Sequence, residues 1–275
     1  MKFRLAAFAD EADSSLDGQI SAMTENGVEY LEIRGVDGEN ISDIKADKAR
    51  DIHARLDAAG ISVWSLGSPF GKIGITEDFE PHLDKFKRGL ELADILGTRH
   101  IRIFSFYVPY DNAEHYSDEV MKRLEKMLVA SKGSGVMLCH ENEKGIYGDN
   151  AERCAEIHKI FSELRAVFDP ANFVQCGQET TSAWELLSPY VEYLHIKDAL
   201  ADGSVVPAGK GIGNIPYILQ RYRGEVLTVE PHLSVFNGLD KLERGDTAER
   251  KYCYPDSRTA FGVAVDALKK IMEEL

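Results

Sequence analysis

The sequence of 275 residues predicts a closed (β/α)8 barrel that forms a single domain over residues 1–275. Short apolar segments alternate eight times with segments whose apolar residues recur at helical spacing, an order that favours a parallel sheet covered by helices. Eight such units in roughly 250 residues fit a closed barrel. A doubly wound open sheet is the alternative, but no GxGxxG motif follows the first predicted strand.

The predicted elements run along the whole chain without a linker or a low-complexity segment. Apolar runs predict strands at residues 3–8, 30–33, 61–66, 100–104, 136–139, 165–168, 191–196 and 225–229. Helical spacing predicts helices at residues 16–26, 44–59, 79–96, 116–131, 150–161, 181–188, 215–221 and 257–274. Glycine ends several of these helices, as at Gly27, Gly60 and Gly97. The irregular insertion near 231–256 is the longest segment without a predicted element, and we expect a lid or a dimer contact there.

Composition narrows the class of protein before any motif is considered. The net charge of −14 and the pI of about 5.1 disfavour extended nucleic-acid binding, because phosphate backbones would be repelled. No apolar run approaches the ~20 residues of a membrane span, and the N-terminus turns acidic too early for a signal peptide. The four cysteines lack zinc spacing and are expected to be reduced thiols. We therefore expect a cytoplasmic protein without a nucleic-acid or membrane partner.

Four polar residues stand out because they follow consecutive predicted strands, at the end where barrel enzymes form their active sites. They are Glu141, Asp169, His195 and Glu230. A carboxylate at the end of a buried strand is costly unless something pairs with it. Each residue alone has a simpler explanation; Asp169, for example, precedes Pro170 and could start a turn. Together, three carboxylates and one imidazole suit Mn²⁺, Mg²⁺, Co²⁺ or Zn²⁺, so we predict one divalent-metal site.

Further polar residues near the strand ends are candidate substrate contacts. They are Glu32, Arg34, Lys72, Arg102, Lys197 and His232. Some have alternatives: Glu32 and Arg34 could form an ion pair in the barrel mouth, and Lys197 could be a solvated lysine paired with Asp198. The glycine-rich turn at 209–213 could hold a phosphate on its backbone N–H groups, or it could be only a tight turn into a helix.

Six fragments resemble the xylose isomerase-like TIM barrel superfamily, in its branch of sugar phosphate isomerases and epimerases. They are Phe8-Ala-Asp-Glu-Ala, Tyr30-Leu-Glu-Ile-Arg, His140-Glu-Asn, Phe168-Asp-Pro-Ala-Asn, Tyr193-Leu-His-Ile-Lys-Asp and Leu227-Thr-Val-Glu-Pro. The resemblance covers about residues 3–231. It implies that Glu141, Asp169, His195 and Glu230 bind one divalent ion. It also implies that Glu141 and Glu230 are catalytic and face opposite sides of a bound keto-sugar.

The implied reaction moves a proton next to a carbonyl group. Such a proton is hard to remove, and a bound ion would polarise the substrate oxygens and stabilise the enediolate. One glutamate would take the proton and the other would return it. We therefore expect a metal-dependent isomerase or epimerase acting on a keto-sugar or sugar phosphate, with a small sugar or polyol as its partner. Barrels of this superfamily often form homodimers or homotetramers.

Two departures from the epimerase pattern keep alternatives open. Asn172 stands where the epimerases carry a histidine, and Ala201 stands where they carry an arginine that contacts substrate. An inosose-type dehydratase would use the same metal site to expel a hydroxyl group. An apurinic-type endonuclease would need more histidines at the strand ends and a less acidic chain. A non-catalytic sugar-binding protein would not need the facing pair Glu141 and Glu230.

Overall fold

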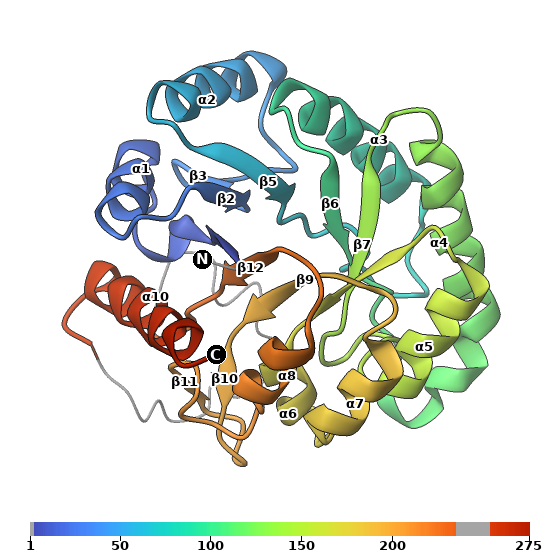
Figure 1. The fold of residues 1–275 in the computed structure, drawn as a ribbon. Coiled ribbons are helices and arrows are strands. Elements are labelled where there is room, and N and C mark those ends of the chain that lie inside the picture. The colour runs from blue at the N-terminus through green and yellow to red at the C-terminus, as the bar shows by residue number, and fades with distance from the viewer. Residues whose placement is uncertain (1–2, 235–253) are drawn as a thin grey trace.

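A computed structural model describes residues 3–234 and 254–275, and it confirms the predicted closed barrel (Figure 1). Eight parallel strands follow one another around the ring in the order β1-β12-β9-β8-β7-β6-β5-β2. The strands are β1 (Arg4–Ala7), β2 (Tyr30–Ile33), β5 (Ser62–Leu66), β6 (His100–Ile103), β7 (Met137–Glu141), β8 (Arg165–Phe168), β9 (Val191–Ile196) and β12 (Val226–Val229). Pairing between the first and last strands, with Ala7 opposite Val229, closes the ring. Most of the predicted insertion near 231–256 lies outside the described residues.

The helices form an outer ring around the strands (Figure 1). The principal helices are α1 (Leu16–Glu25), α2 (Ala46–Ala58), α3 (Glu80–Ile95), α4 (Ser117–Ser131), α5 (Ala151–Ile160), α7 (Thr180–Leu187), α8 (Ile215–Arg221) and α10 (Ser257–Glu273). Their bounds agree with the sequence-based prediction to within two residues. Gly27, Gly60 and Gly97 follow three of them with φ between +60° and +72°, a conformation that glycine adopts without strain.

Several short elements were not predicted, and most of them lie at the carboxyl ends of the strands. Strand β7 extends through His140 and Glu141 rather than ending at Cys139, because Glu141 still pairs with Val167 of β8. A helix, α6 (Pro170–Gln175), replaces the turn expected after Asp169. Two small hairpins, two 3-10 helices and α6 therefore shape the mouth of the barrel. The remaining elements are η1 (Ala9–Glu11), β3 (Gly35–Val36), β4 (Glu39–Asn40), η2 (Tyr110–Tyr116), β10 (Asp198–Ala199) and β11 (Val205–Val206).

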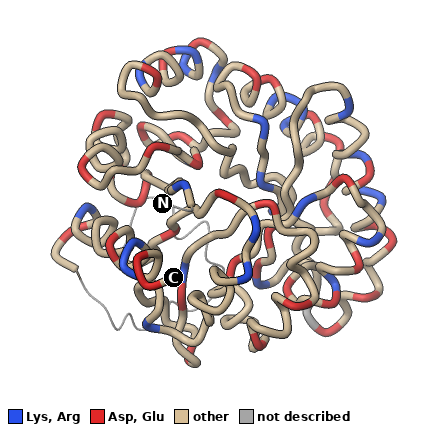
Figure 2. Tube along the Cα trace, in the orientation of Figure 1, with Lys and Arg blue, Asp and Glu red and all other residues tan. Residues whose placement is uncertain are grey.

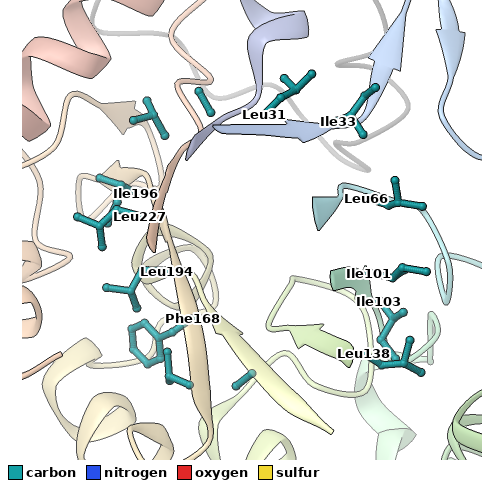
Figure 3. Packing of buried hydrophobic residues seen from close by; sticks show 14 of the residues in the cluster. Leu31, Ile33, Leu66, Ile101, Ile103, Leu138, Phe168, Leu194, Ile196 and Leu227 are labelled. Atoms are coloured by element: carbon teal, nitrogen blue, oxygen red, sulfur yellow. The ribbon is translucent and has the colours of Figure 1, made fainter. Parts of the chain in front are cut away.

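The hydrophobic core lies mainly between the strands and the helices, and a smaller cluster fills the barrel interior. Leu194 and Ile196 of β9 belong to this main core. They lie there with apolar side chains from the other strands, such as Leu138 and Leu227 (Figure 3). Tyr193 belongs to the inner cluster. Because side chains alternate along a strand, His195 shares the inward face with Tyr193. This alternation turns the candidate metal ligand toward the barrel axis.

Charged residues cover the outer helices, and both signs also occur on the central strands within the ring of helices (Figure 2). Buried charges need partners, so those inside the barrel indicate an organised polar site. In the part of the chain that the structure describes, no helix is long and apolar enough to cross a membrane.

Candidate metal centre

The four predicted metal ligands meet at the carboxyl end of four neighbouring strands. Glu141 ends β7, His195 lies in β9, and Asp169 and Glu230 directly follow β8 and β12. One ligand atom from each residue lies within 4.8 Å of the others. Their exposed fractions are between 0% and 4%, so the cluster is shielded from bulk water. The barrel thus brings together side chains that are up to 89 residues apart in sequence, from Glu141 to Glu230.

His195 lies at the centre of this cluster. Its Nδ1 is 2.9 Å from Glu141 Oε1 and 3.3 Å from Glu230 Oε2. Its Nε2 is 3.1 Å from Glu32 Oε2, and Tyr193 donates a hydrogen bond of 2.8 Å to the other oxygen of Glu32. Burial opposes a charged imidazole, but Glu141 and Glu32 outweigh it and raise the pKa of His195 well above its usual value. Nδ1 therefore faces the candidate ligands, and Glu32 holds the opposite edge of the ring.

Lys197 points into the cluster. Its Nζ lies 3.1 Å from Asp169 Oδ2 and 3.0 Å from Glu230 Oε2, and the side chain is 4% exposed. Burial raises the pKa of Asp169 to about 7, although Lys197 opposes that effect. Burial would lower the pKa of Lys197, but Asp169 and Glu230 raise it well above its usual value. The alternative of a solvated lysine paired with Asp198 is therefore wrong.

Two arginines form ion pairs with the catalytic candidates Glu141 and Glu230. Arg102 Nη1 lies 3.2 Å from Glu141 Oε2. Arg34 binds Asp10 through two contacts of 2.9 Å and also reaches Glu11 at 3.1 Å and Glu230 at 3.3 Å. Asp10 and Glu11 were not predicted as site residues, although they follow the first strand and belong to the fragment Phe8-Ala-Asp-Glu-Ala. The arginines add positive charge beside both glutamates.

Neighbouring basic side chains keep Glu141 and Glu230 ionised. Burial raises the pKa of a carboxyl group, but His195 and Arg102 reverse this effect and lower the pKa of Glu141. Lys197, together with hydrogen bonds from His195 and His232, likewise overcomes burial and holds the pKa of Glu230 well below its usual value. Both residues therefore offer carboxylate oxygens at neutral pH.

His232 is held beside Glu230 in an unusual backbone conformation. Its φ is +45°, in the left-handed region, and its backbone N–H donates a hydrogen bond of 2.6 Å to Glu11 Oε2. Its Nε2 lies 3.3 Å from Glu230 Oε1 and 3.4 Å from Glu11 Oε1. Burial lowers the pKa of His232 to about 4 and raises that of Glu11 to about 8. Glu11 therefore fixes the position of a histidine that contacts a catalytic candidate.

The buried oxygens and the ligand types of the cluster fit a divalent ion. Glu141 Oε2 and Asp169 Oδ2 are buried, yet neither accepts a hydrogen bond from any residue that the structure describes. Their contacts with Arg102 and Lys197 meet the distance for an ion pair but not the geometry of a hydrogen bond. Buried oxygens of this kind are costly without a partner. Three carboxylates and an imidazole are a donor set that Mn²⁺, Mg²⁺, Co²⁺ and Zn²⁺ accept.

The predicted substrate contacts fall into two groups. Lys72, Arg102, Lys197 and His232 line a small cavity beside the cluster, with a volume of about 20 Å³. The Nζ of Lys72 is 3.1 Å from Glu143 Oε2 and 4.3 Å from the centre of the Phe104 ring. Glu32 and Arg34 do not line this cavity; they contact His195 and Glu230 instead.

Asn172 and Asn142 support the cluster, and neither was predicted to do so. Asn172 Nδ2 donates hydrogen bonds to Glu141 Oε1 at 3.2 Å and to the Asn142 carbonyl at 2.9 Å. Asn142 exchanges two hydrogen bonds of 2.9 Å with the backbone of Asp169. Asp169 Oδ1 caps α6 by accepting from the Asn172 N–H, which leaves Oδ2 facing Lys197. Asn172, which stands where the epimerases carry a histidine, thus orients the candidate metal ligand Glu141.

The glycine-rich turn after β10 is occupied by the carboxylate of Asp198. Its Oδ2 accepts hydrogen bonds from the N–H groups of Gly209 and Gly211, and its Oδ1 accepts from Gly213 and Ala199, at 2.8–3.0 Å. A Cβ on Gly211 would lie 2.3 Å from the Ala199 carbonyl oxygen, so the turn requires glycine there. The glycine N–H groups that could have held a phosphate therefore donate their hydrogen bonds to Asp198 instead. The segment is a tight turn, as the alternative interpretation of the sequence predicted.

We expect Asp198→Ala to lower the free energy of unfolding by about 2–4 kcal/mol, because four backbone N–H groups lose their acceptor. Urea unfolding followed by circular dichroism would measure the change. Asp266→Ala, on the exposed face of α10, is the matched control and should leave the midpoint unchanged. Equal midpoints for the two variants would contradict the anchoring role of Asp198.

The fold and the cluster define a (β/α)8 barrel with a candidate metal centre at the carboxyl ends of its strands. A family model described as xylose isomerase-like TIM barrel matches residues 20–230, and the chain belongs to that family.

Solved structures share this fold at low sequence identity. The IolI protein with a bound zinc atom is 15% identical, with a TM-score of 0.75 and 99% of both chains covered. The probable 3-DHS dehydratase AsbF from Bacillus anthracis is 17% identical, with a TM-score of 0.72 over 98% of this chain and 99% of that one. D-psicose 3-epimerase with D-tagatose, from Clostridium cellulolyticum H10, is 13% identical, with a TM-score of 0.71 over 98% of this chain and 99% of that one. None of the curated proteins matches the chain.

Proposed function

We propose that this protein is a divalent-metal-dependent isomerase or epimerase that acts on a keto-sugar or sugar phosphate. The observation that carries the proposal is the pair of buried carboxylates Glu141 and Glu230, which both reach the Nδ1 atom of His195. A single buried carboxylate would suffice for binding a sugar hydroxyl. Two ionised carboxylates at one small cavity suit a reaction in which one group accepts a proton and another returns it.

Glu141, Asp169, His195 and Glu230 are the residues that would hold the ion. A divalent ion at this place supplies Lewis-acid polarisation of the carbonyl and hydroxyl oxygens of a bound sugar. Zinc is bound in the IolI structure that shares this fold.

The chain's own residues provide the proton transfer and its control. Glu141 and Glu230 accept and return the proton on the carbon next to the carbonyl group. Arg102 beside Glu141, and Lys197 beside Glu230, favour the ionised form of both groups in the resting protein. The glutamate that returns a proton on the opposite face must therefore first take one from a water molecule or a substrate hydroxyl group. The low exposure of the cluster limits contact with bulk water, so the proton moves between the substrate and these carboxyl groups. A carboxyl group that exchanges its proton with D₂O before returning it delivers deuterium to the carbon.

Glu32 and Arg34 act in this proposal as positioning residues, although the sequence favoured substrate contacts. Glu32 accepts from Nε2 of His195 and leaves Nδ1 directed at the carboxylates. Residues that orient a metal-binding histidine in this way commonly have a large effect on metal affinity. Arg34 fixes Glu230 together with the acidic residues after β1.

A dehydratase is the second candidate, and Lys197 is the observation that favours it. Its ammonium group lies between Asp169 and Glu230, where it could donate a proton to a departing hydroxyl group. The same deprotonation would then end in loss of water instead of return of the proton. The fold shared with a probable 3-DHS dehydratase supports keeping this alternative.

Solvent exchange separates the two candidates. The protein, loaded in turn with Mn²⁺, Mg²⁺, Co²⁺ and Zn²⁺, would be incubated with keto-sugars, their phosphates and inososes in D₂O. Deuterium at the carbon next to the carbonyl group, without loss of water, is expected for the isomerase or epimerase. A new enone absorbance would support the dehydratase. If no divalent ion is found in the purified protein and none is taken up on addition, the metal centre itself is refuted.

A further inference from the structure

Two cavities open beside the metal centre, and they share part of their walls. The inner one, next to Glu141 and Glu230, has about 20 Å³, which is room for an ion or a water molecule but not for a sugar. The outer one has about 410 Å³, within the range of small-molecule sites. Lys144 and Gln175 line both cavities. A substrate whose reacting carbon lies at the inner cavity therefore has space for its remaining atoms beyond Lys144.

Lys144 differs from the other lysines and arginines that line the inner cavity. Arg102 contacts Glu141, Lys197 contacts Asp169 and Glu230, and Lys72 contacts Glu143. Across residues 3–234 and 254–275, no carboxylate lies within ion-pair distance of the Lys144 ammonium group. The contact between Lys144 and the Glu143 carboxylate is made by the backbone N–H of Lys144 and not by its side chain. This places an uncompensated positive charge where the two cavities meet. A divalent ion at the metal centre would add to that positive charge.

The outer cavity supplies little negative charge to balance Lys144. Asp149 is its one acidic lining residue, and the guanidinium of Arg153 is bound to that carboxylate. Arg153 also donates a hydrogen bond of 2.6 Å to the Tyr147 carbonyl, so its position is fixed. The other polar lining groups are amides, including Gln175 and Gln178, which can pair with hydroxyl groups. The cavity thus combines neutral hydrogen-bonding groups with one free cation.

We propose that Lys144 binds an anionic group of the substrate, a carboxylate or a phosphate, and that the hydroxylated chain of the substrate lies in the outer cavity. This inference rests on the proposed function and narrows its substrate class to acidic keto-sugars. Ala201 is exposed and uncharged at the position where the epimerases carry an arginine. In this proposal Lys144 supplies the positive charge that Ala201 lacks. In a chain with a net charge of −14, a local cation is needed to offset the repulsion of an anionic substrate.

Binding measurements with three probes test the proposal. Fructose, fructuronate and fructose 6-phosphate would be titrated by calorimetry into the full-length protein loaded with Mn²⁺. We expect at least one acidic probe to bind about tenfold or more tightly than fructose. The comparison between fructuronate and fructose 6-phosphate identifies which anion is preferred. Similar affinity for all three probes, or no binding of either acidic probe, would overturn the proposal.

Variants assign the preference to one side chain. Lys144→Met keeps the aliphatic stem and should reduce the preference for the acidic probe to less than about threefold, while Lys144→Arg should keep most of it. Lys159→Met, at the exposed end of α5, is the matched control and should behave like the unmodified protein. A preference that survives Lys144→Met would refute the role of Lys144. Because the comparison reads the affinity for each probe and not its conversion, an intact anion preference in a protein that fails the D₂O test would refute the proposed function alone.

Discussion

Replacing Glu141 or Glu230 with glutamine should reduce turnover and solvent deuterium exchange by about 100-fold or more, the usual contribution of a general acid or base. Glutamine keeps the size of the side chain and one oxygen, but it cannot accept the proton. Exchange into a keto-sugar substrate, followed by NMR in D₂O, measures the effect. Metal content should be determined in parallel, because a variant that keeps its ion and loses exchange isolates the proton-transfer role.

Glu225→Gln provides the matched control for this experiment. Glu225 is exposed at the opposite end of β12 from Glu230, so its replacement removes a carboxylate from the same segment without touching the cluster. Exchange should stay at the level of the unmodified protein. Full activity in Glu141→Gln would show that another group removes the proton, and the proposed shuttle would have to be abandoned.

Replacing Arg34 with methionine should lower the free energy of unfolding by about 3–5 kcal/mol, the usual loss when one partner of a buried ion pair is removed. Arg34 is 4% exposed and contacts Asp10, Glu11 and Glu230. Methionine fills part of the volume but leaves these carboxylates without the guanidinium. Urea unfolding at neutral pH, followed by circular dichroism and tryptophan fluorescence, measures the loss.

Two further variants separate electrostatics from packing in the Arg34 experiment. Arg50→Met removes an exposed arginine that pairs with Asp47, and it should change the unfolding midpoint little. Adding Asp10→Asn to Arg34→Met should recover part of the stability, because the carboxylate that makes two contacts of 2.9 Å with Arg34 is then removed together with its partner. If Arg34→Met unfolds at the same midpoint as Arg50→Met, the buried network does not stabilise the fold.

The sequence was sufficient for the fold because barrel strands and helices have distinct local patterns. Apolar runs marked all eight strands, and helical spacing with terminal glycines marked the helices between them. It also predicted that Glu141, Asp169, His195 and Glu230 would converge, because the carboxyl ends of parallel strands meet at one face of a barrel. Their convergence is observed, and their binding of an ion remains a prediction.

Only the tertiary structure decided which charges pair inside the barrel. Lys197 lies next to Asp198 in sequence but contacts Asp169 and Glu230, because successive side chains of the extended chain after β9 point in opposite directions. Asp198 instead binds the N–H groups of the glycine-rich turn. Glu32 reaches His195 across 163 residues, a partner that no local pattern identifies.

The physical reason for this division is the range of the interactions involved. Secondary structure follows from the periodicity of nearby side chains, which a sequence displays directly. The hydrogen bonds and ion pairs of a buried polar site depend on the distances between side chains from different strands and on which competing partner is closer. The sequence therefore determined the barrel and the face on which its chemistry would lie, whereas the tertiary structure decided that Glu32 orients His195 and that Lys144 keeps an unbalanced charge at the mouth.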